Sequence, residues 1–139
     1  MRRRRNRVCL GLIVLGLLNI AVYTMVYALI GGDAWNGGIH EGQHYVSGHF
    51  IRSVEGRPTP VSKGVWVYSY VHSITIWPSL AIIVLSMLIL ARPHIMATCR
   101  GDRISGGLVV TVIAAVVVIL TAVGTIALTT SFIAVLSRS

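Results

Sequence analysis

The sequence predicts an all-α membrane fold, with three transmembrane helices and a glycine-rich outer loop that contains a short β-hairpin. Composition and charge distribution carry this prediction. The chain of 139 residues is 55% hydrophobic and 12% charged, whereas soluble domains average about 25% charged residues. The charges are also missing in long blocks. A chain of this length is expected to form a single membrane domain over residues 1–139.

Three blocks, residues 8–30, 65–91 and 108–136, contain no Asp, Glu, Lys or Arg. A hydrocarbon core about 30 Å thick is crossed by roughly 20 helical residues, so each block is long enough. Strands that span membranes alternate in polarity, and these blocks do not. Lipid offers the backbone no hydrogen-bond partner, so each block should be a helix. We expect the three helices to pack as a bundle.

The basic residues predict the orientation of the chain. Eight Lys and Arg residues lie in the N-terminal segment and the 92–107 loop, and four lie on the other side of the membrane. This bias predicts that the N-terminus and the 92–107 loop are cytoplasmic, and that the 31–64 loop and the C-terminus face outward. The N-terminal cluster adjoins an apolar helix, which favours contact with anionic lipid headgroups rather than nucleic acid. Its members are Arg2, Arg3, Arg4, Arg5 and Arg7.

The first block also resembles a secretory signal, because Val26-Tyr27-Ala28 matches a small-residue cleavage site. Its apolar run is longer than the roughly 7–15 residues usual for a signal peptide. We therefore expect a retained helix, with cleavage after Ala28 as the alternative.

The outer loop opens with turn-forming residues over 31–38. Two β-prone runs flank Ser47-Gly48, which predicts a hairpin over residues 44–51. Ser62 is expected to cap the second helix. Three aromatic residues at the start of that helix predict a belt at the outer membrane surface; they are Trp66, Tyr68 and Tyr70.

Two prolines bear on the second helix. Pro78 is predicted to kink it near the middle of the block, because proline lacks an N–H and its ring crowds the preceding turn. Arg92-Pro93 is predicted to end it. Small residues in the third block, among them Gly124 and Ala127, allow close helix contacts in lipid.

His72 is the single histidine in the three blocks, which lack the acidic or basic groups that proton-coupled transporters normally use. One interpretation makes His72 a haem ligand or proton relay. The favoured one is a neutral His in a hydrogen-bonded network that could include Ser69 and Ser73. Asn19 in the first block could likewise bond across a helix interface. No motif typical of a nucleotide-binding loop, a zinc protease or a serine hydrolase is present.

The histidines of the outer loop suggest a second chemistry. Imidazoles are common ligands of Zn²⁺ and Cu²⁺, and His40, His44 and His49 could form a metal site with His72. Their spacing in a glycine-rich loop is weakly specific. The favoured alternative is that they are polar residues packing over the helix ends.

Several short patterns within residues 31–72 look familiar. They are Gly31-Gly32-Asp33-Ala34, Tyr45-Val46, His49, Val61-Ser62, Tyr68-Ser69 and His72. Together they resemble a group of small, uncharacterised bacterial inner-membrane proteins. The chain departs from that group at His44-Tyr45, His49-Phe50 and Pro60-Val61-Ser62, where the group has Tyr-Tyr, His-Gly and Glu-Val-Ser. The resemblance implies a bacterial inner membrane, a structured outer loop, and a constellation that includes His49 and His72.

From these patterns we expect a non-enzymatic membrane protein without a cofactor. It would be an accessory or scaffold subunit that packs with another membrane protein or with itself. Two alternatives remain open, a His-based metal- or haem-binding module and a small channel or transporter lined by Ser and Thr.

Overall fold

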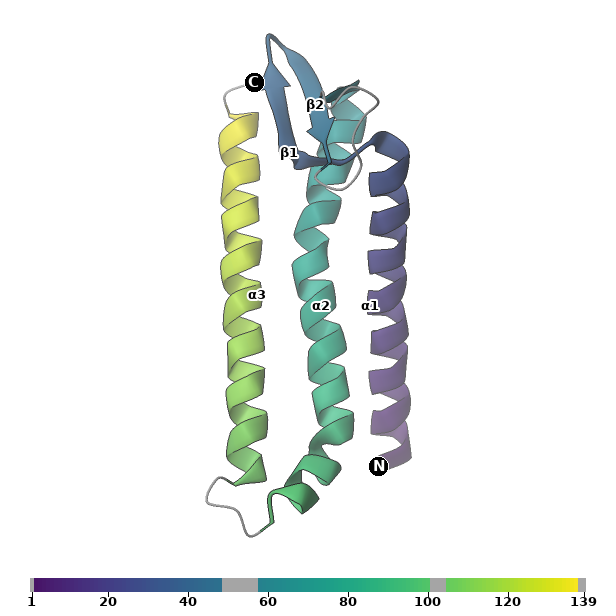
Figure 1. Ribbon diagram of the computed structural model, residues 1–139, viewed down its shortest axis with the longest axis vertical. Coiled ribbons are helices and arrows are strands. Elements are labelled where there is room, and N and C mark those ends of the chain that lie inside the picture. The colour runs from purple at the N-terminus through teal and green to yellow at the C-terminus, as the bar shows by residue number, and fades with distance from the viewer. Residues whose placement is uncertain (1, 49–57, 101–104, 138–139) are drawn as a thin grey trace.

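The computed structural model describes residues 2–48, 58–100 and 105–137. Three long helices and a small sheet make up this part of the chain (Figure 1). In chain order the elements are α1 (Arg2–Ile30), β1 (Asp33–His40), β2 (Gln43–Ser47), β3 (Thr59–Val61), α2 (Lys63–Thr98) and α3 (Gly106–Leu136).

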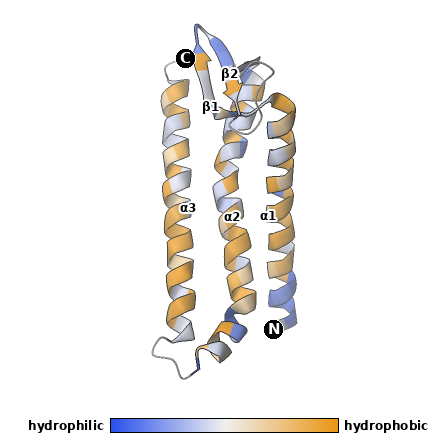
Figure 2. Cartoon of the chain, viewed as in Figure 1, coloured by the Kyte–Doolittle hydropathy of each residue, from blue (hydrophilic) through white to orange (hydrophobic). Residues whose placement is uncertain are grey.

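The three predicted helices are confirmed, and each is long and apolar enough to cross a membrane. Figure 2 shows hydrophilic residues at the start of α1 and near the end of α2, at the opposite end of the molecule from the sheet. The helices between these ends are largely apolar. This distribution supports a multi-pass membrane protein. Ser62 caps α2 as expected, because its hydroxyl accepts a hydrogen bond from the Val65 N–H.

The predicted end of the second helix at Arg92-Pro93 is wrong, because α2 continues to Thr98 with both Pro78 and Pro93 inside it. A proline removes one backbone hydrogen bond, and the remaining bonds can still carry the helix past it. Here the Thr98 hydroxyl donates to the His94 carbonyl at 3.0 Å, and the Cys99 N–H donates to the Ile95 carbonyl at 3.0 Å. Figure 1 shows α2 changing direction near this end.

The helices form a layer rather than the expected bundle. The central helix α2 packs along α1 on one side and along α3 on the other, and among the described residues α1 and α3 have no extensive contact with each other. Figure 1 shows the three helices side by side in the order α1, α2, α3. Both broad faces of the layer are therefore left uncovered by the described part of the chain.

Glycines set the spacing within this layer. A Cβ at Gly16 of α1 would lie 2.6 Å from Cγ1 of Ile83 in α2. A Cβ at Gly124 of α3 would lie between 2.5 and 2.8 Å from ring atoms of Trp77. Real Cβ contacts are longer than this, so each glycine permits an approach of neighbouring helices that alanine would prevent.

The outer hairpin exists, but its predicted position is wrong. The turn lies at Glu41-Gly42 and joins β1 to β2, with His40 paired to Gln43. Both turn residues have positive φ, 51° and 77°, as two-residue hairpin turns of the favoured type require. Of residues 31–38, all expected to be turns, residues 31 and 32 do form a turn, whereas residues 33–38 belong to strand β1. Its pairing is irregular between Asp33 and Gly38. The second half of the predicted hairpin, residues 49–51, lies outside the described residues.

The sheet covers the end of the helical layer. Its strands pair antiparallel in the order β1-β2-β3. A small apolar core lies between the sheet and the helices, formed by Ala34, Val46, Trp66 and Tyr70, with Phe132 of α3 packed against it. Trp66 is fully buried. Two of the three residues predicted as an aromatic belt therefore face the sheet and α3, and Tyr68 is half exposed.

Candidate functional site

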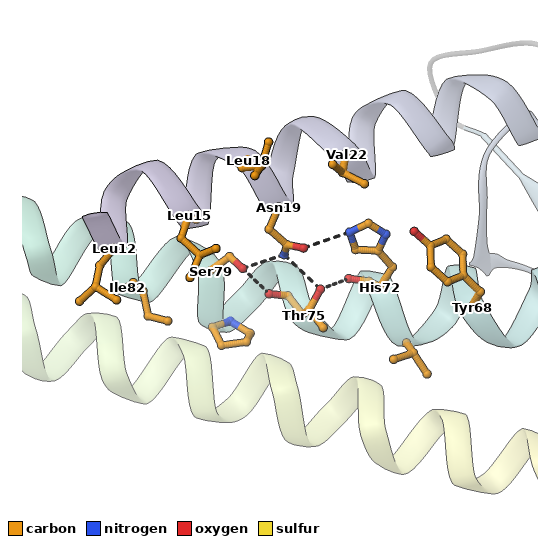
Figure 3. A pocket seen from close by; sticks show the side chains of 13 residues that line it. Leu12, Leu15, Leu18, Asn19, Val22, Tyr68, His72, Thr75, Ser79 and Ile82 are labelled. Atoms are coloured by element: carbon orange, nitrogen blue, oxygen red, sulfur yellow. Dashed lines mark hydrogen bonds between the residues drawn. The ribbon is translucent and has the colours of Figure 1, made fainter. Parts of the chain in front are cut away.

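Asn19 is the centre of a polar network between α1 and α2. Its amide nitrogen donates to the Ser79 hydroxyl at 2.8 Å and to the Thr75 hydroxyl at 3.2 Å. Its amide oxygen lies 3.2 Å from Nε2 of His72. Figure 3 shows these four side chains converging from the two helices. One α1 residue is thus hydrogen-bonded to three residues on successive turns of α2.

The proton positions in this network follow from the bonds themselves. The hydroxyl of Ser79 donates its single hydrogen to the Thr75 carbonyl at 2.8 Å, and that of Thr75 donates to the His72 carbonyl at 2.7 Å. Both hydroxyl oxygens can then only accept, so Asn19 must direct its NH₂ group toward them. Its oxygen faces His72, whose Nε2 must therefore carry the hydrogen. With one proton on the ring, Nδ1 of His72 is a bare acceptor.

That acceptor has no partner among the residues that the structure describes. His72 is 8% exposed, and its Nδ1 is buried without a hydrogen bond. The His72 ring packs against two tyrosine rings, with distances between ring centroids of 5.3 Å to Tyr23 and 5.4 Å to Tyr68. An unsatisfied buried acceptor costs roughly 1–3 kcal/mol, which marks it as a feature that requires an explanation.

The network forms the polar part of a groove of about 630 Å³ between α1 and α2. The groove is lined mainly by aliphatic side chains, and Figure 3 shows several of them flanking the network. The lining residues are Leu12, Leu15, Gly16, Leu18, Asn19, Val22, Tyr68, Val71, His72, Thr75, Pro78, Ser79 and Ile82. This groove can bind an apolar molecule and form hydrogen bonds with it at the polar network.

A second polar cluster joins the sheet to the helices. Asp33, which is 6% exposed at the start of β1, accepts a hydrogen bond from the Tyr23 hydroxyl at 3.0 Å. The same carboxylate accepts from the backbone and side-chain nitrogens of Asn36, at 2.8 and 3.1 Å. The Tyr23 hydroxyl also lies 3.4 Å from that of Ser73. The Ala34 N–H donates to the Ser69 hydroxyl at 3.1 Å.

The structure separates two of the histidines proposed as metal ligands, His40 and His44. In the paired strands, His40 lies opposite Gln43 and His44 lies opposite Ile39. Because paired residues share a face and successive residues alternate, His40 and His44 are on opposite faces of the hairpin. His44 packs against Trp66, with a ring centroid distance of 5.6 Å. His49 lies outside the described residues, among which no group of three His, Cys, Asp or Glu could hold a metal ion.

The residues predicted to pack between helices all lie on or near the α1–α2 contact. Asn19, Ser69 and Ser73 make the hydrogen bonds given above, and Pro78 lines the groove. The arginines predicted to touch lipid headgroups form the first turns of α1, with exposed side chains at Arg3, Arg4, Arg5 and Arg7, and with Arg2 as the first helical residue.

Sequence reasoning missed Tyr23, Asp33, Thr75 and Ser79 as members of these clusters. Asp33 lies within residues 31–38, which were expected to form turns. A signal was present in α2, where small hydroxyl residues recur at helical spacing: Ser69, Ser73, Ser79 and Ser86 are all buried. Ser69 and Ser73 are four residues apart and Ser79 and Ser86 are seven apart, so the members of each pair share a side of α2. Ser73 and Ser79 bond to α1 residues, whereas Ser69 bonds to β1.

Fold and site together define a multi-pass helical membrane protein with a sheet at one end and an internal polar network. Comparisons of this chain with family models, curated proteins and solved structures found no match.

Proposed function

We propose that this chain is a small accessory or scaffold protein of a bacterial inner membrane, without an enzymatic activity of its own. It would work with another membrane protein or with a second copy of itself. The observation that supports this most directly is the open layer of helices. α3 contacts α2 along one side, and its apolar residues on the other sides are exposed, including Ile119 at 60% and Val123 at 62%.

A layer of this kind suits lateral association. In lipid, helices associate through close packing and interhelical hydrogen bonds, and each added helix contributes a further packed surface. In this chain α2 has two neighbours, whereas α1 and α3 have one each among the described residues. A partner helix packed on the layer would give α1 or α3 a second neighbour.

The sheet supports a scaffold role at the membrane surface. It is tied to α1 through Asp33 and Tyr23, and to α2 through Ala34 and Ser69. A small sheet anchored at both helices is a rigid surface, which loses little conformational entropy on binding. Trp35 is 54% exposed on β1. Exposed tryptophan is enriched at protein interfaces.

The chemistry of the groove supports a non-catalytic role. Its lining offers one imidazole, one phenol, two aliphatic hydroxyls and an amide. Both aliphatic hydroxyls donate to backbone carbonyls, so neither is paired with the imidazole as a nucleophile with its base would be.

The orientation proposed from the basic residues places the start of α1 and the end of α2 in the cytoplasm. Cys99 provides a native probe, because it is partly exposed and unpaired, whereas the other cysteine, Cys9, is buried. A membrane-impermeant maleimide should label Cys99 in inside-out vesicles and leave it unlabelled in intact spheroplasts. Labelling in the spheroplasts would reverse the orientation.

Photo-crosslinking in the native membrane tests the association itself. A photoreactive amino acid is placed at Val123 on α3, at Leu17 on α1, or at Trp35 on the sheet. We expect at least one site to give a discrete adduct of defined mass, identified by mass spectrometry as a second copy or as one recurrent membrane protein. Absence of any discrete adduct at all three sites would refute the proposal.

A further inference from the structure

Nδ1 of His72 is a hydrogen-bond acceptor without a partner among the described residues, and its depth in the membrane can be worked out from the sequence. His72 lies seven residues beyond Val65, where the apolar run of α2 begins, which corresponds to about 10 Å along the helix. Water is scarce at that depth, and an unsatisfied acceptor there is costly. Among the residues that the structure describes, no side chain or backbone group donates to this nitrogen. A molecule dissolved in the membrane is one source of such a donor.

The groove has the size and lining of a ligand site. Its volume of about 630 Å³ falls within the roughly 300–1,000 Å³ typical of small-molecule pockets. It is elongated along the helices, because Leu12 and Val22, both in its lining, are ten residues apart on α1, or about 15 Å. His72 lies toward the Val22 end in Figure 3, and Leu12 and Ile82 lie at the other. The imidazole of His72 is therefore near one end of an apolar groove.

We propose that this groove binds a long-chain lipid alcohol, with its hydroxyl donating to Nδ1 of His72 and its chain lying along Leu12, Leu15 and Ile82. The polarity of the bond selects the ligand class. A bare acceptor requires an O–H or N–H donor. An ammonium group would carry a full charge into the hydrocarbon region, at much greater cost than a neutral hydroxyl. An elongated apolar groove fits a flexible chain attached to that hydroxyl.

Tyr68 lies beside the buried nitrogen. Its ring centroid lies 5.4 Å from that of His72, and Figure 3 shows it on the side of the imidazole away from Asn19, which is the side of Nδ1. Tyr68 is 49% exposed and lies at the rim of the groove. Because Nδ1 is buried in the structure, the proposal requires this side chain to rotate before a ligand can reach it. The bound alcohol would take the place of the Tyr68 ring edge.

Nitrogen NMR of the full chain in lipid nanodiscs tests the proposal directly, because the ¹⁵N resonance of an unprotonated imidazole nitrogen moves when it accepts a hydrogen bond. The probes are farnesol and farnesyl methyl ether, which share the same chain and differ in the O–H donor. We expect farnesol to move the His72 Nδ1 resonance in a saturable manner, and the ether to leave it in place. No shift with farnesol, or equal shifts with both probes, overturns the proposal.

One pair of variants locates the ligand. Leu15 and Leu17 lie on the same helix at 62% and 53% exposure, and Leu15 lines the groove whereas Leu17 is absent from its lining. Leu15→Trp should weaken farnesol binding by roughly tenfold or more, and Leu17→Trp should leave it unchanged. Equal effects of the two substitutions would place the alcohol outside the groove and overturn the assignment.

The Tyr68→Phe variant tests whether the chain supplies the donor itself. If it leaves the His72 Nδ1 resonance of the alcohol-free protein in place and retains the farnesol response, the donor comes from the ligand, as proposed. If Tyr68→Phe alone moves that resonance, the tyrosine hydroxyl is the native donor, and the alcohol site is refuted.

Discussion

Replacing Asn19 by leucine is expected to lower the free energy of unfolding in a bilayer by about 2 kcal/mol. Asn19 makes three hydrogen bonds across the α1–α2 contact, to Ser79, Thr75 and His72, at 2.8, 3.2 and 3.2 Å. Interhelical hydrogen bonds in membranes contribute on average about 0.6 kcal/mol each, with a maximum near 1.7. Leucine has the same branching as asparagine and is not smaller, so the expected loss arises from hydrogen bonding rather than from a cavity.

Reversible unfolding in bicelles, followed by steric trapping, measures this loss. A double-mutant cycle with Ser79→Ala isolates the shortest bond, for which we expect a coupling energy of about 0.6 kcal/mol or more. Thr130→Val is the control, since the Thr130 hydroxyl faces outward and donates to carbonyls of its own helix. If Asn19→Leu were no more destabilising than Thr130→Val, or its coupling to Ser79→Ala were zero, the network would not hold α1 against α2.

The remaining predictions concern the sheet and the α2–α3 contact. Tyr23→Phe removes the hydroxyl between Asp33 and Ser73, and should cost about 1 kcal/mol and speed amide exchange in β1. Asp33→Ala should accelerate exchange there further, because it leaves several buried donors unpaired, while the exchange of α3 stays unchanged. Gly124→Ala should lower the thermal midpoint in detergent, because its Cβ would meet the Trp77 ring, and overpacking costs about 1–3 kcal/mol.

Matched controls exist for these variants. Gly107→Ala, in the same helix as Gly124, adds a Cβ that meets no atom within 4 Å, so it should leave the midpoint unchanged. Equal midpoints for the two alanine variants would mean that α3 does not pack closely on Trp77. For the sheet, unchanged exchange in β1 after Asp33→Ala would show that the carboxylate does not anchor the strand.

Much of the fold could be predicted because it depends on local properties. A block without charge that is longer than the membrane is thick must be a helix in lipid, whatever surrounds it. Ser62 was recognisable as a cap because its contact with Val65 lies within one turn. The predictions failed where strand pairing overrode a local turn preference. Residues 33–40 are glycine-rich and look like turns, yet they form β1, because β2 supplies backbone partners and the close approach of Tyr45 to Gly37 leaves no space for a side chain.

The sequence by itself determined the number of helices, their boundaries to within a few residues except at the start of α1 and the end of α2, and the presence of polar residues within the apolar blocks. The tertiary structure decided which of these residues meet. Asn19 and His72 are 53 positions apart, and their contact depends on how α1 and α2 are rotated and how closely they approach at Gly16. Those quantities follow from packing between helices, which no local pattern encodes. For the same reason only the structure showed a layer in place of a bundle, and a buried acceptor on His72 with no hydrogen-bond partner among the described residues.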